Sequence, residues 1–427
     1  MAAGVRLGAR RSAKLADMIA GQKRTFDVLE EARRTTAPEG FDLWVHAASL
    51  GEFEQARPVI EAYRSKRPEA KILLTFFSPS GYNVRHDYDR VDCVAYLPFD
   101  TPANARRFVD LVRPRAVMFV KYEFWGNFLS EIRRRDIPLY LISAIFRPGQ
   151  SFFKSWGGTF RAMLPCYTHI FVQDEDSRRL LETIGVTNVT VAGDTRFDRV
   201  VDIAGHPREL PAVRAWADND EFAVPGAHRG PRRPFTLVAG SSWPADEEYY
   251  IPWLNAHPQV HAIIAPHEFD DRRLEVLQRS LTGKSVFLST IGEDGKIAHD
   301  TQVLIADCYG LLSSLYQFAD AAIIGGGLGA GIHNINEAAV YGIPVAFGPN
   351  HAKFKEALDL RTAHGRSASG ATPMTAASVY ANAAQCRDIL ERWLTDAEAR
   401  KEAGAAARHY IYTHTGATPK ILKVLLP

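Results

Sequence analysis

The sequence has little cysteine, no long apolar run and almost no excess of charge of either sign. Its four cysteines lie far apart and form no CxxC pair: Cys93, Cys166, Cys308 and Cys386. That spacing argues against a zinc site or a disulfide framework and fits a reducing compartment. No run of about 18 apolar residues is present, so we expect no transmembrane helix. The N-terminus also lacks the apolar core of a secretory signal.

The charge balance excludes a general attraction to nucleic acid. Lysine and arginine number 51 against 49 acidic residues, which leaves a net charge of +2. We therefore expect no nucleic-acid partner, and any electrostatic targeting must be local. The 427 residues suffice for two domains with separate cores, and 46% hydrophobic and 23% charged residues are typical of a globular protein.

The first 24 residues are locally basic. Their cations are opposed only by Asp17 and alternate with apolar side chains. A basic amphipathic helix of this kind can lie on an anionic membrane surface. The alternative is a solvated helix that packs against the domain. The cations are Arg6, Arg10, Arg11, Lys14, Lys23 and Arg24.

Strand-like apolar segments alternate with helical segments along most of the chain. They lie at 41–49, 71–77, 93–98, 116–120, 139–143, 169–173, 189–192, 235–240, 260–266, 285–288, 303–306, 321–324 and 345–348. This alternation predicts βαβ units and parallel sheets with ligand loops at the carboxyl ends of the strands. We expect an α/β fold of two doubly wound, Rossmann-like domains that face each other across a cleft. The first domain spans 1–205, a Pro-, Gly- and charge-rich linker spans 206–234, and the second domain with C-terminal helices spans 235–427.

A glycine-rich loop at 325–331 follows one of these strands. A strand, a glycine loop and a helix start, here near His333, bring backbone N–H groups close to an anion, so Gly326, Gly327 and Gly329 are candidate phosphate contacts. Glu337 falls about one turn into that helix, where a carboxylate suits a ribose diol. We interpret the stretch as the nucleotide end of a sugar-nucleotide site. It also matches a relaxed dinucleotide fingerprint, but it comes late and no acid ends the next strand.

Two carboxylates follow strands in the first domain. Glu52 stands where the first strand gives way to a helix, and a general base there is held as the anion by the helix dipole yet keeps some proton affinity. The alternative is that Glu52 only complements the dipole. Glu123 follows the fourth strand and precedes bulky aromatic residues. It is either a second carboxylate in the cleft or an ordinary loop residue.

Other strand ends carry polar side chains that suit a phosphate or a base. Arg196 offers a bidentate fork to a phosphate, or pairs with Asp194 or Asp198 in its own loop. Ser241 and Ser242 either grip phosphate or cap the helix that follows. His267 either contacts a base or is structural.

Together and in this order, the motifs resemble the 3-deoxy-D-manno-octulosonic-acid (Kdo) transferases of lipid A assembly. The matching segments are 46–52, 123–127, 193–198, 240–242, 265–268, 325–337 and 347–349. The resemblance implies a GT-B fold and an inverting, metal-independent transfer of Kdo from CMP-Kdo to a lipid A precursor at the cytoplasmic face of the inner membrane. CMP-Kdo is then a substrate, and no cofactor is expected.

The resemblance also assigns residues. Glu52 matches the catalytic base and Glu123 the second acidic position, with Ser49 and Gly51 on the acceptor side. The second-domain motifs, including His333 and Asn334, match the CMP-binding face. Family members usually begin with an apolar membrane anchor, where this chain has the basic stretch. Ala338 replaces a common Pro, and no Arg stands between Pro266 and His267.

An amphiphilic, phosphorylated acceptor draws attention to residues 152–161. Aromatic side chains alternate there with cations, which suits an interfacial surface, and we select Lys154, Trp156 and Arg161 as acceptor contacts. The alternative is an amphipathic helix that faces the core. Two rival functions are another GT-B enzyme that uses a UDP-sugar, such as a transferase or epimerase, and a catalytically silent membrane-associated protein that binds sugar nucleotides.

Overall fold

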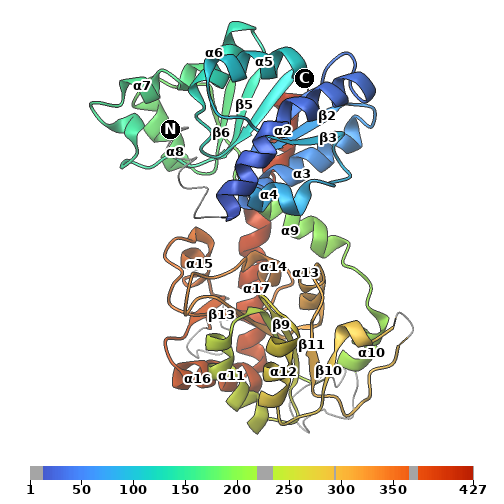
Figure 1. Cartoon of the computed structure of the whole chain (residues 1–427). Helices are drawn as coiled ribbons and strands as arrows, with labels where there is room; N and C mark the ends of the chain where they lie inside the picture. Colours follow the sequence, from blue (N-terminus) through green and yellow to red (C-terminus); the bar gives the residue numbers. More distant parts are fainter. Residues whose placement is uncertain (1–12, 219–233, 293–294, 365–373, 427) are drawn as a thin grey trace. The chain divides into compact units, whose positions relative to one another are not determined.

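The computed structural model describes residues 13–218, 234–292, 295–364 and 374–426 (Figure 1). The chain forms two compact units. Unit 1 comprises Met1–Asp198 together with Thr415–Pro427, and unit 2 comprises Arg199–His414. Each unit is built on one sheet of seven strands, and every pairing within the two sheets is parallel.

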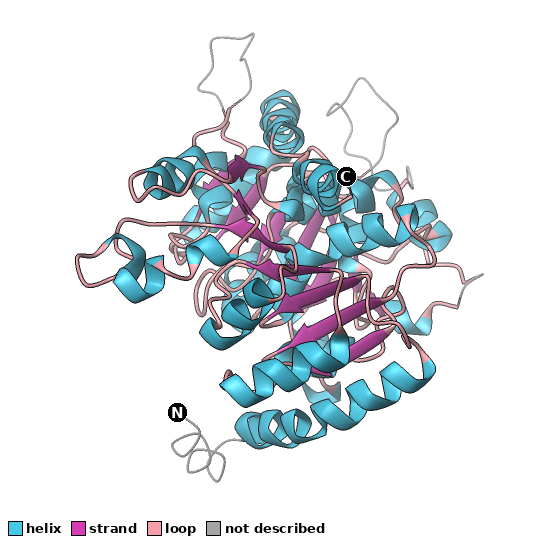
Figure 2. Cartoon of the chain, turned by 90° about the horizontal axis from the view of Figure 1, so that it is seen from above, coloured by secondary structure: helices cyan, strands magenta, loops and turns pink. Residues whose placement is uncertain are grey.

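The sheet of unit 1 has the strand order β3-β2-β1-β4-β5-β6-β7. Its strands are β1 (Leu43–Ala47), β2 (Ile72–Phe76), β3 (Cys93–Tyr96), β4 (Ala116–Val120), β5 (Leu139–Ala144), β6 (His169–Val172) and β7 (Val189–Val191). The helices are α2 (Ala13–Thr35), α3 (Leu50–Lys66), α4 (Pro79–Arg85), α5 (Pro102–Val112), α6 (Gly126–Arg134), α7 (Gly158–Arg161), α8 (Glu175–Glu182) and α18 (Ala417–Leu425), with 3-10 turns at Ser151–Phe153 and Leu164–Cys166. Helix α9 (Thr195–Gly205) begins in unit 1 and continues into unit 2. Figure 2 shows the strands enclosed by helices.

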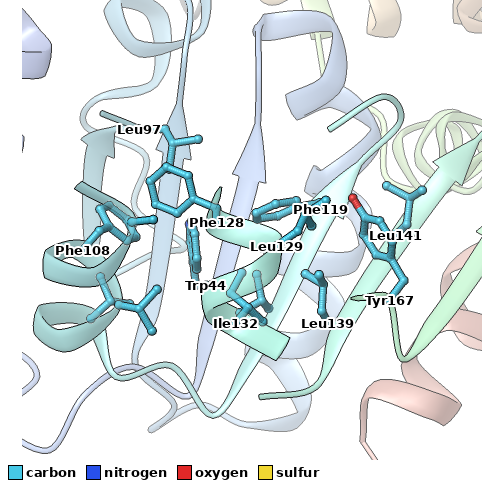
Figure 3. Packing of buried hydrophobic residues seen from close by; sticks show 14 of the residues in the cluster. Trp44, Leu97, Phe108, Phe119, Phe128, Leu129, Ile132, Leu139, Leu141 and Tyr167 are labelled. Carbon is cyan, nitrogen blue, oxygen red and sulfur yellow. The ribbon is translucent and has the colours of Figure 1, made fainter. Parts of the chain in front are cut away.

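Both faces of this sheet are buried, because neighbouring residues of one strand enter different cores. Trp44 belongs to a cluster with residues of α2, α5 and α6, whereas Val45 belongs to a cluster with residues of α3 and α18. The Trp44 ring lies 4.7 Å from Phe108 and 5.3 Å from Phe119, centroid to centroid (Figure 3). A sheet covered on both sides leaves only its strand ends available for ligands.

Helix α2 packs on unit 1 along the face that carries Met18, Gln22, Thr25 and Leu29, all of which are buried. The hydroxyl of Thr25 donates to the Tyr96 carbonyl at 3.0 Å. Lys23 and Arg24 lie on the solvent side. The structure therefore supports packing for this part of the predicted basic helix. Arg6, Arg10, Arg11 and the Lys14 side chain lie outside the described residues.

The sheet of unit 2 has the order β10-β11-β9-β8-β12-β13-β14. Its strands are β8 (Thr236–Ser242), β9 (His261–Pro266), β10 (Ser285–Phe287), β11 (Val303–Ile305), β12 (Ala321–Ile324), β13 (Val345–Phe347) and β14 (Ala377–Val379). The helices are α10 (Pro211–Ala217), α11 (Pro244–Ala256), α12 (Asp271–Ser280), α13 (Leu312–Leu315), α14 (Asn336–Ala339), α15 (Lys355–Leu360), α16 (Ala383–Thr395) and α17 (Ala397–Thr413), with 3-10 turns at Leu288–Thr290 and Tyr316–Phe318. Every strand predicted from the sequence is present, and β14 was missed.

The predicted domain boundaries need two corrections. Unit 2 begins at Arg199, so residues 199–205 of the predicted first domain and residues 206–218 of the predicted linker both belong to it. The Trp216 indole N–H anchors helix α10 in this unit by donating to the Thr301 carbonyl at 2.7 Å. The last 13 residues belong to unit 1 instead of the second domain. The Asp198 carboxylate accepts the N–H groups of Gly416 at 2.5 Å and Thr418 at 2.6 Å, which caps α18. Ile421 and Leu425 then enter the core beneath α3.

Candidate functional site

In each unit the strand order reverses beside its first strand. In unit 1 this point lies between β1 and β4, and in unit 2 between β8 and β12. Doubly wound sheets bind ligands at the carboxyl ends of such a strand pair, because the two loops leave it in opposite directions. Glu52, Glu123, Ser241 with Ser242, and the glycine loop lie at the ends of these four strands, whereas Arg196 follows β7 and His267 follows β9. We call the two places the β1/β4 edge and the β8/β12 edge.

Glu52 lies at the β1/β4 edge in the first turn of α3. Ser49 is the N-cap residue, and its hydroxyl donates to the Glu52 carboxylate. The carboxylate is half-buried at the end of the helix where the dipole favours negative charge. Gly51 is exposed beside it. The three predicted residues of this motif are thus together, with Glu52 held by Ser49.

Glu123 follows β4 at the same edge but is buried, with 5% of its surface exposed. Its Oε2 lies 3.1 Å from Nε2 of His46 and also accepts the indole N–H of Trp125. Its backbone carbonyl accepts the hydroxyl of Tyr167. Of the two alternatives open from the sequence, this environment favours a structural loop residue. The side chain joins β1 to the loop after β4.

Arg196 lies in unit 1, where its guanidinium pairs with Asp194. Its Nε and Nη2 donate to Oδ2 of Asp194 at 2.9 and 2.8 Å. This ion pair with Asp194 is one of the two alternatives open from the sequence. The Arg196 guanidinium contributes to lowering the pKa of the Asp194 carboxyl, against burial, which acts to raise it. Asp194 also accepts from the amide of Gln55 at 3.2 Å, so the pair braces helix α3 three residues beyond Glu52.

The predicted acceptor contacts lie around the turn before α7. Trp156 is 67% exposed, and its neighbour Phe160 is 37% exposed at 6.3 Å between ring centroids. Lys154 is exposed, whereas Nη1 of Arg161 donates to the carbonyls of Phe152 and Lys154 at 3.0 and 2.8 Å. Arg161 thus fixes the loop that presents Trp156. The alternative of a helix facing the core is wrong for Trp156.

The glycine loop lies at the β8/β12 edge and packs against two other backbone segments. A Cβ on Gly325 would lie 2.1 Å from the Ser241 carbonyl oxygen, and one on Gly327 would lie 2.5 Å from the Gly348 nitrogen. Gly326 has a φ of +90°. Side chains are therefore excluded for steric reasons at these positions.

Part of the loop's hydrogen-bonding capacity is used internally. The Gly326 N–H donates to Oδ2 of Asp246 at 2.9 Å, and the N–H groups of Gly329 and Gly331 both donate to the Gly326 carbonyl at 3.0 Å. The expected helix near His333 begins only at Asn336 and spans four residues. The loop therefore does not lead straight into a helix, and any anion here meets loop groups and not a helix N-terminus.

Ser241 and Ser242 have different environments. Ser241 is half-buried with a φ of +50° at an irregularity in the β8–β9 register. Ser242 is buried, and its hydroxyl donates to Glu247 at 3.1 Å and bonds the Tyr250 hydroxyl at 2.9 Å. Neither caps α11, whose N-cap residue is Trp243. Only Ser241 remains placed to meet a ligand.

His267 and His333 come together with Trp243. The His267 ring lies 4.2 Å from His333 and 4.7 Å from Trp243, between centroids. The indole N–H of Trp243 donates to Nε2 of His333 at 3.2 Å. Burial, with a smaller contribution from His267, lowers the pKa of His333 to about 4, so this ring is neutral at neutral pH. The sequence analysis missed Trp243.

Glu337 and Asn334 are bonded to each other. Oε1 of Glu337 accepts from the Asn334 amide at 3.0 Å, and Oε2 accepts from the Ser313 hydroxyl at 2.7 Å. The carboxylate is half-buried. An ionised carboxylate has two oxygens with about four lone-pair sites, so it can accept several donors at once.

Asp246 was also missed. Its Oδ2 accepts from Gly326 and from the Trp243 N–H at 3.2 Å, and its Oδ1 accepts from the Tyr380 hydroxyl at 3.3 Å. Burial raises the pKa of this carboxyl. Its position three residues after the N-cap residue of α11 is the signal that identifies it, because a carboxylate there reaches back to the N-cap N–H.

The chain is similar in sequence to known proteins. Residues 14–199 match the family model described as 3-deoxy-D-manno-octulosonic-acid transferase (kdotransferase), a range that covers nearly all of the first segment of unit 1. The 3-deoxy-D-manno-octulosonic acid transferase of Bordetella pertussis is 28% identical over 417 residues, which cover 92% of this chain and 88% of the relative. Over most of its length the chain is therefore similar to the Kdo transferases, which are glycosyltransferases.

Solved structures of other enzymes share the fold of this chain. MurG of Acinetobacter baumannii superposes with a TM-score of 0.53 at 11% identity, over 90% of this chain and 99% of MurG. A protein of Listeria monocytogenes solved as a candidate UDP-N-acetylglucosamine 2-epimerase gives 0.57 at 12% identity, over 90% and 96%. The chain has the GT-B fold, and identities this low show the fold alone.

Within the described ranges, no three His, Cys, Asp or Glu side chains are grouped so as to hold a metal ion. None of the described helices is both long and apolar enough to cross a bilayer. A cavity of about 650 Å³ lies between α11 and α12, lined by apolar residues such as Ile251 and Leu277 and by none of the predicted site residues.

Proposed function

We propose that this enzyme transfers Kdo from CMP-Kdo to a lipid A precursor with inversion and without a metal, and that Glu52 is the general base. The observation that carries the proposal is Glu52 itself. It is a half-buried carboxylate at the strand-reversal edge of unit 1, bonded to Ser49 at the start of a helix. The carboxylates of Glu123 and Asp194, near the same edge, are buried and already paired, which leaves Glu52 for proton transfer.

In the proposed step Glu52 takes the proton of an acceptor hydroxyl. The hydroxyl oxygen forms a bond to the anomeric carbon of Kdo from the face opposite the phosphate. The bond between that carbon and the phosphate oxygen breaks, and CMP leaves with the electron pair. A positioned base of this kind contributes about 10²–10⁴-fold to the rate.

Unit 2 binds the CMP part of the donor in this proposal. The glycine loop with Gly327 and Gly329, the backbone at Ser241 and the ring of His333 surround the phosphate. Glu337, with Asn334 behind it, accepts the ribose hydroxyls, and His267 lies beside the base. Neutral donors in a partly dehydrated site stabilise the departing phosphate, so a metal is not required by the chemistry.

Three predicted residues support other residues in this scheme. Arg196 and Ser242 are engaged by Asp194 and Glu247, so they hold α3 and α11 in place and do not contact phosphate. Glu123, bonded to His46 and Trp125, fixes the loop after β4.

We place the acceptor and the membrane at the exposed turn around Trp156. Trp156 and Phe160 offer apolar surface, and Lys154 offers a cation to the acceptor's phosphates. These features suit a peripheral enzyme at the cytoplasmic face of the inner membrane. Arg161 contributes by holding the turn.

The test is a transfer assay with CMP-Kdo and an acylated diglucosamine bisphosphate acceptor. We expect the wild-type enzyme to transfer and Glu52→Gln to lose about 10²–10⁴-fold in turnover while CMP binding is kept. Glu54→Gln is the matched control, because Glu54 is half-buried on the same helix and pairs with Arg85 at 3.3 Å. Equal turnover of Glu52→Gln and wild type contradicts the base. Turnover of a UDP-sugar in place of CMP-Kdo contradicts the donor.

A further inference from the structure

Three rings meet where three neighbouring strands of unit 2 end. Trp243 follows β8, His267 follows β9, and His333 lies in the loop after β12; the strands are adjacent in the order β9-β8-β12. The rings of Trp243 and His267 are stacked with 23° between their planes. This stacking sets the plane of the indole, and with it the direction in which the indole N–H points.

The indole N–H points at one nitrogen of His333. It donates to Nε2 at 3.2 Å, and an indole nitrogen can only donate. Nε2 must therefore carry a lone pair, which places the proton of the neutral ring on Nδ1. A proton on Nε2 would set two donors against each other, so the bond disfavours both the other tautomer and the imidazolium ion.

The other nitrogen of His333 is available. Nδ1 makes no hydrogen bond to any residue in the described ranges, and it is not among their fully buried unsatisfied atoms. The backbone N–H of His333 donates to the Gly325 carbonyl at 3.3 Å, which ties the residue to the glycine loop. The ring thus stands at the β8/β12 edge with one nitrogen fixed by Trp243 and one free to meet a ligand.

We propose that Trp243 is a positioning residue that holds His333 as the Nδ1–H tautomer, so that Nδ1–H donates to a phosphate oxygen of bound CMP. This inference rests on the proposed function, which places CMP at this edge. Trp243 acts through His333, and its contribution is the fixed direction of one neutral donor. A ring free to exchange tautomers would present a lone pair to the phosphate for part of the time and would repel it.

The test compares two tryptophan variants of the full-length enzyme. Trp243→Phe keeps an aromatic ring over His267 but removes the donor to His333. Trp253→Phe is the matched control, because Trp253 stacks on His257 at 4.4 Å and donates its indole N–H to Glu391 at 2.9 Å elsewhere in unit 2. Nitrogen-15 NMR of labelled histidine reports the tautomer of His333, with His333→Gln to assign the signal. Calorimetry at pH 8 reports the affinity for CMP and for cytidine.

We expect wild type and Trp253→Phe to show the Nδ1–H tautomer and the same CMP affinity. Trp243→Phe should show mixed tautomers and about three- to ten-fold weaker CMP binding, the worth of one hydrogen bond, with cytidine affinity unchanged. Equal losses for CMP and cytidine would overturn the phosphate contact. An Nε2–H tautomer in the wild type, which needs no variant to fold, would overturn the inference and leave the proposed function standing. Failure of the wild type to bind CMP would instead contradict the proposed function.

Discussion

The β1/β4 edge of unit 1 and the β8/β12 edge of unit 2 each lie where the strand order reverses beside the first strand of a seven-stranded parallel sheet, although the two strand orders differ. At the first, a helix of 17 residues starts directly after the strand and presents the half-buried carboxylate of Glu52. At the second, a glycine loop follows β12, and the nearby carboxylate of Asp246 is buried and accepts backbone N–H groups. One edge offers a proton acceptor, whereas the other offers glycine backbone and a neutral imidazole donor.

This difference shows that similar strand reversals can carry different side chains. The reversal of strand order decides where loops diverge, and the side chains decide which chemistry is placed there. In unit 2 Asp246 accepts the Gly326 N–H and Glu247 pairs with Arg273, so both acids are held by internal bonds. In unit 1 Glu123 is likewise buried and bonded to His46, whereas Glu52 is bonded to Ser49 but only half-buried.

The largest effect is expected from adding a side chain to the glycine loop. Gly327→Ala places a Cβ 2.5 Å from the Gly348 nitrogen, and because the neighbour is backbone it cannot turn aside. We expect a loss of about 1–3 kcal/mol in unfolding free energy and loss of CMP binding, measured by denaturant unfolding and calorimetry. Gly329→Ala is the control, because its nearest atom would be 3.9 Å away. If both variants had the same unfolding free energy and the same CMP affinity, close packing would not explain why glycine is needed at Gly327.

A smaller effect is expected at the ribose. Glu337→Gln leaves the Ser313 contact possible but replaces one acceptor oxygen by a donor. We expect CMP affinity to fall roughly ten-fold, since a hydrogen bond to a charged group is worth about 1.5–3 kcal/mol. The wild type should prefer CMP to 2′-deoxy-CMP, and the variant should lose that preference. A variant that still discriminates between the two nucleotides would exclude the ribose contact.

The two units can also be compared through their exposed aromatic residues, which are Trp156 in unit 1 and Tyr309 in unit 2. Trp156→Ser should weaken binding to anionic liposomes roughly ten-fold, because withdrawing about 60 Å² of apolar area at about 25 cal/mol per Å² costs about 1.5 kcal/mol. Tyr309→Ser in unit 2, where Tyr309 is 76% exposed, serves as the control. Flotation in which both variants bind like the wild type would remove the membrane contact from this turn.

The smallest effect is expected at Glu131, a carboxylate of unit 1 that contributes to stability and not, in our proposal, to catalysis. Hydrogen bonds from Arg134, assisted by Arg135 and opposed by burial, lower the pKa of Glu131 from about 4.5 to about 2. The stabilisation from this group is therefore complete above about pH 4.5 and is lost as the pH falls toward 2. Glu131→Gln should flatten that part of the thermal stability profile without changing turnover. An unchanged acid profile would show that the ion pairs contribute nothing.

The sequence predicted most of the strands and the division into two units, because apolar periodicity and glycine punctuation are local signals. It did not predict the strand order that places the two edges. It did not predict which polar atoms are already used inside the fold. Ser242 and Arg196 look equivalent to ligand contacts until Glu247 and Asp194 are placed beside them. Glu123 depends likewise on His46, which lies 77 positions away in the chain.

The Asp198 carboxylate caps α18 by accepting two N–H groups that lie 218 and 220 positions further along the chain. This long-range contact has a practical consequence. The stretch recognised as the family's N-terminal region ends at residue 199, yet one wall of that region's interior is supplied by Ile421, Leu422 and Leu425. A recombinant fragment that ends at residue 199 would expose the apolar surface of α3 that these three residues cover. A fragment designed for the study of unit 1 in isolation should therefore include α18.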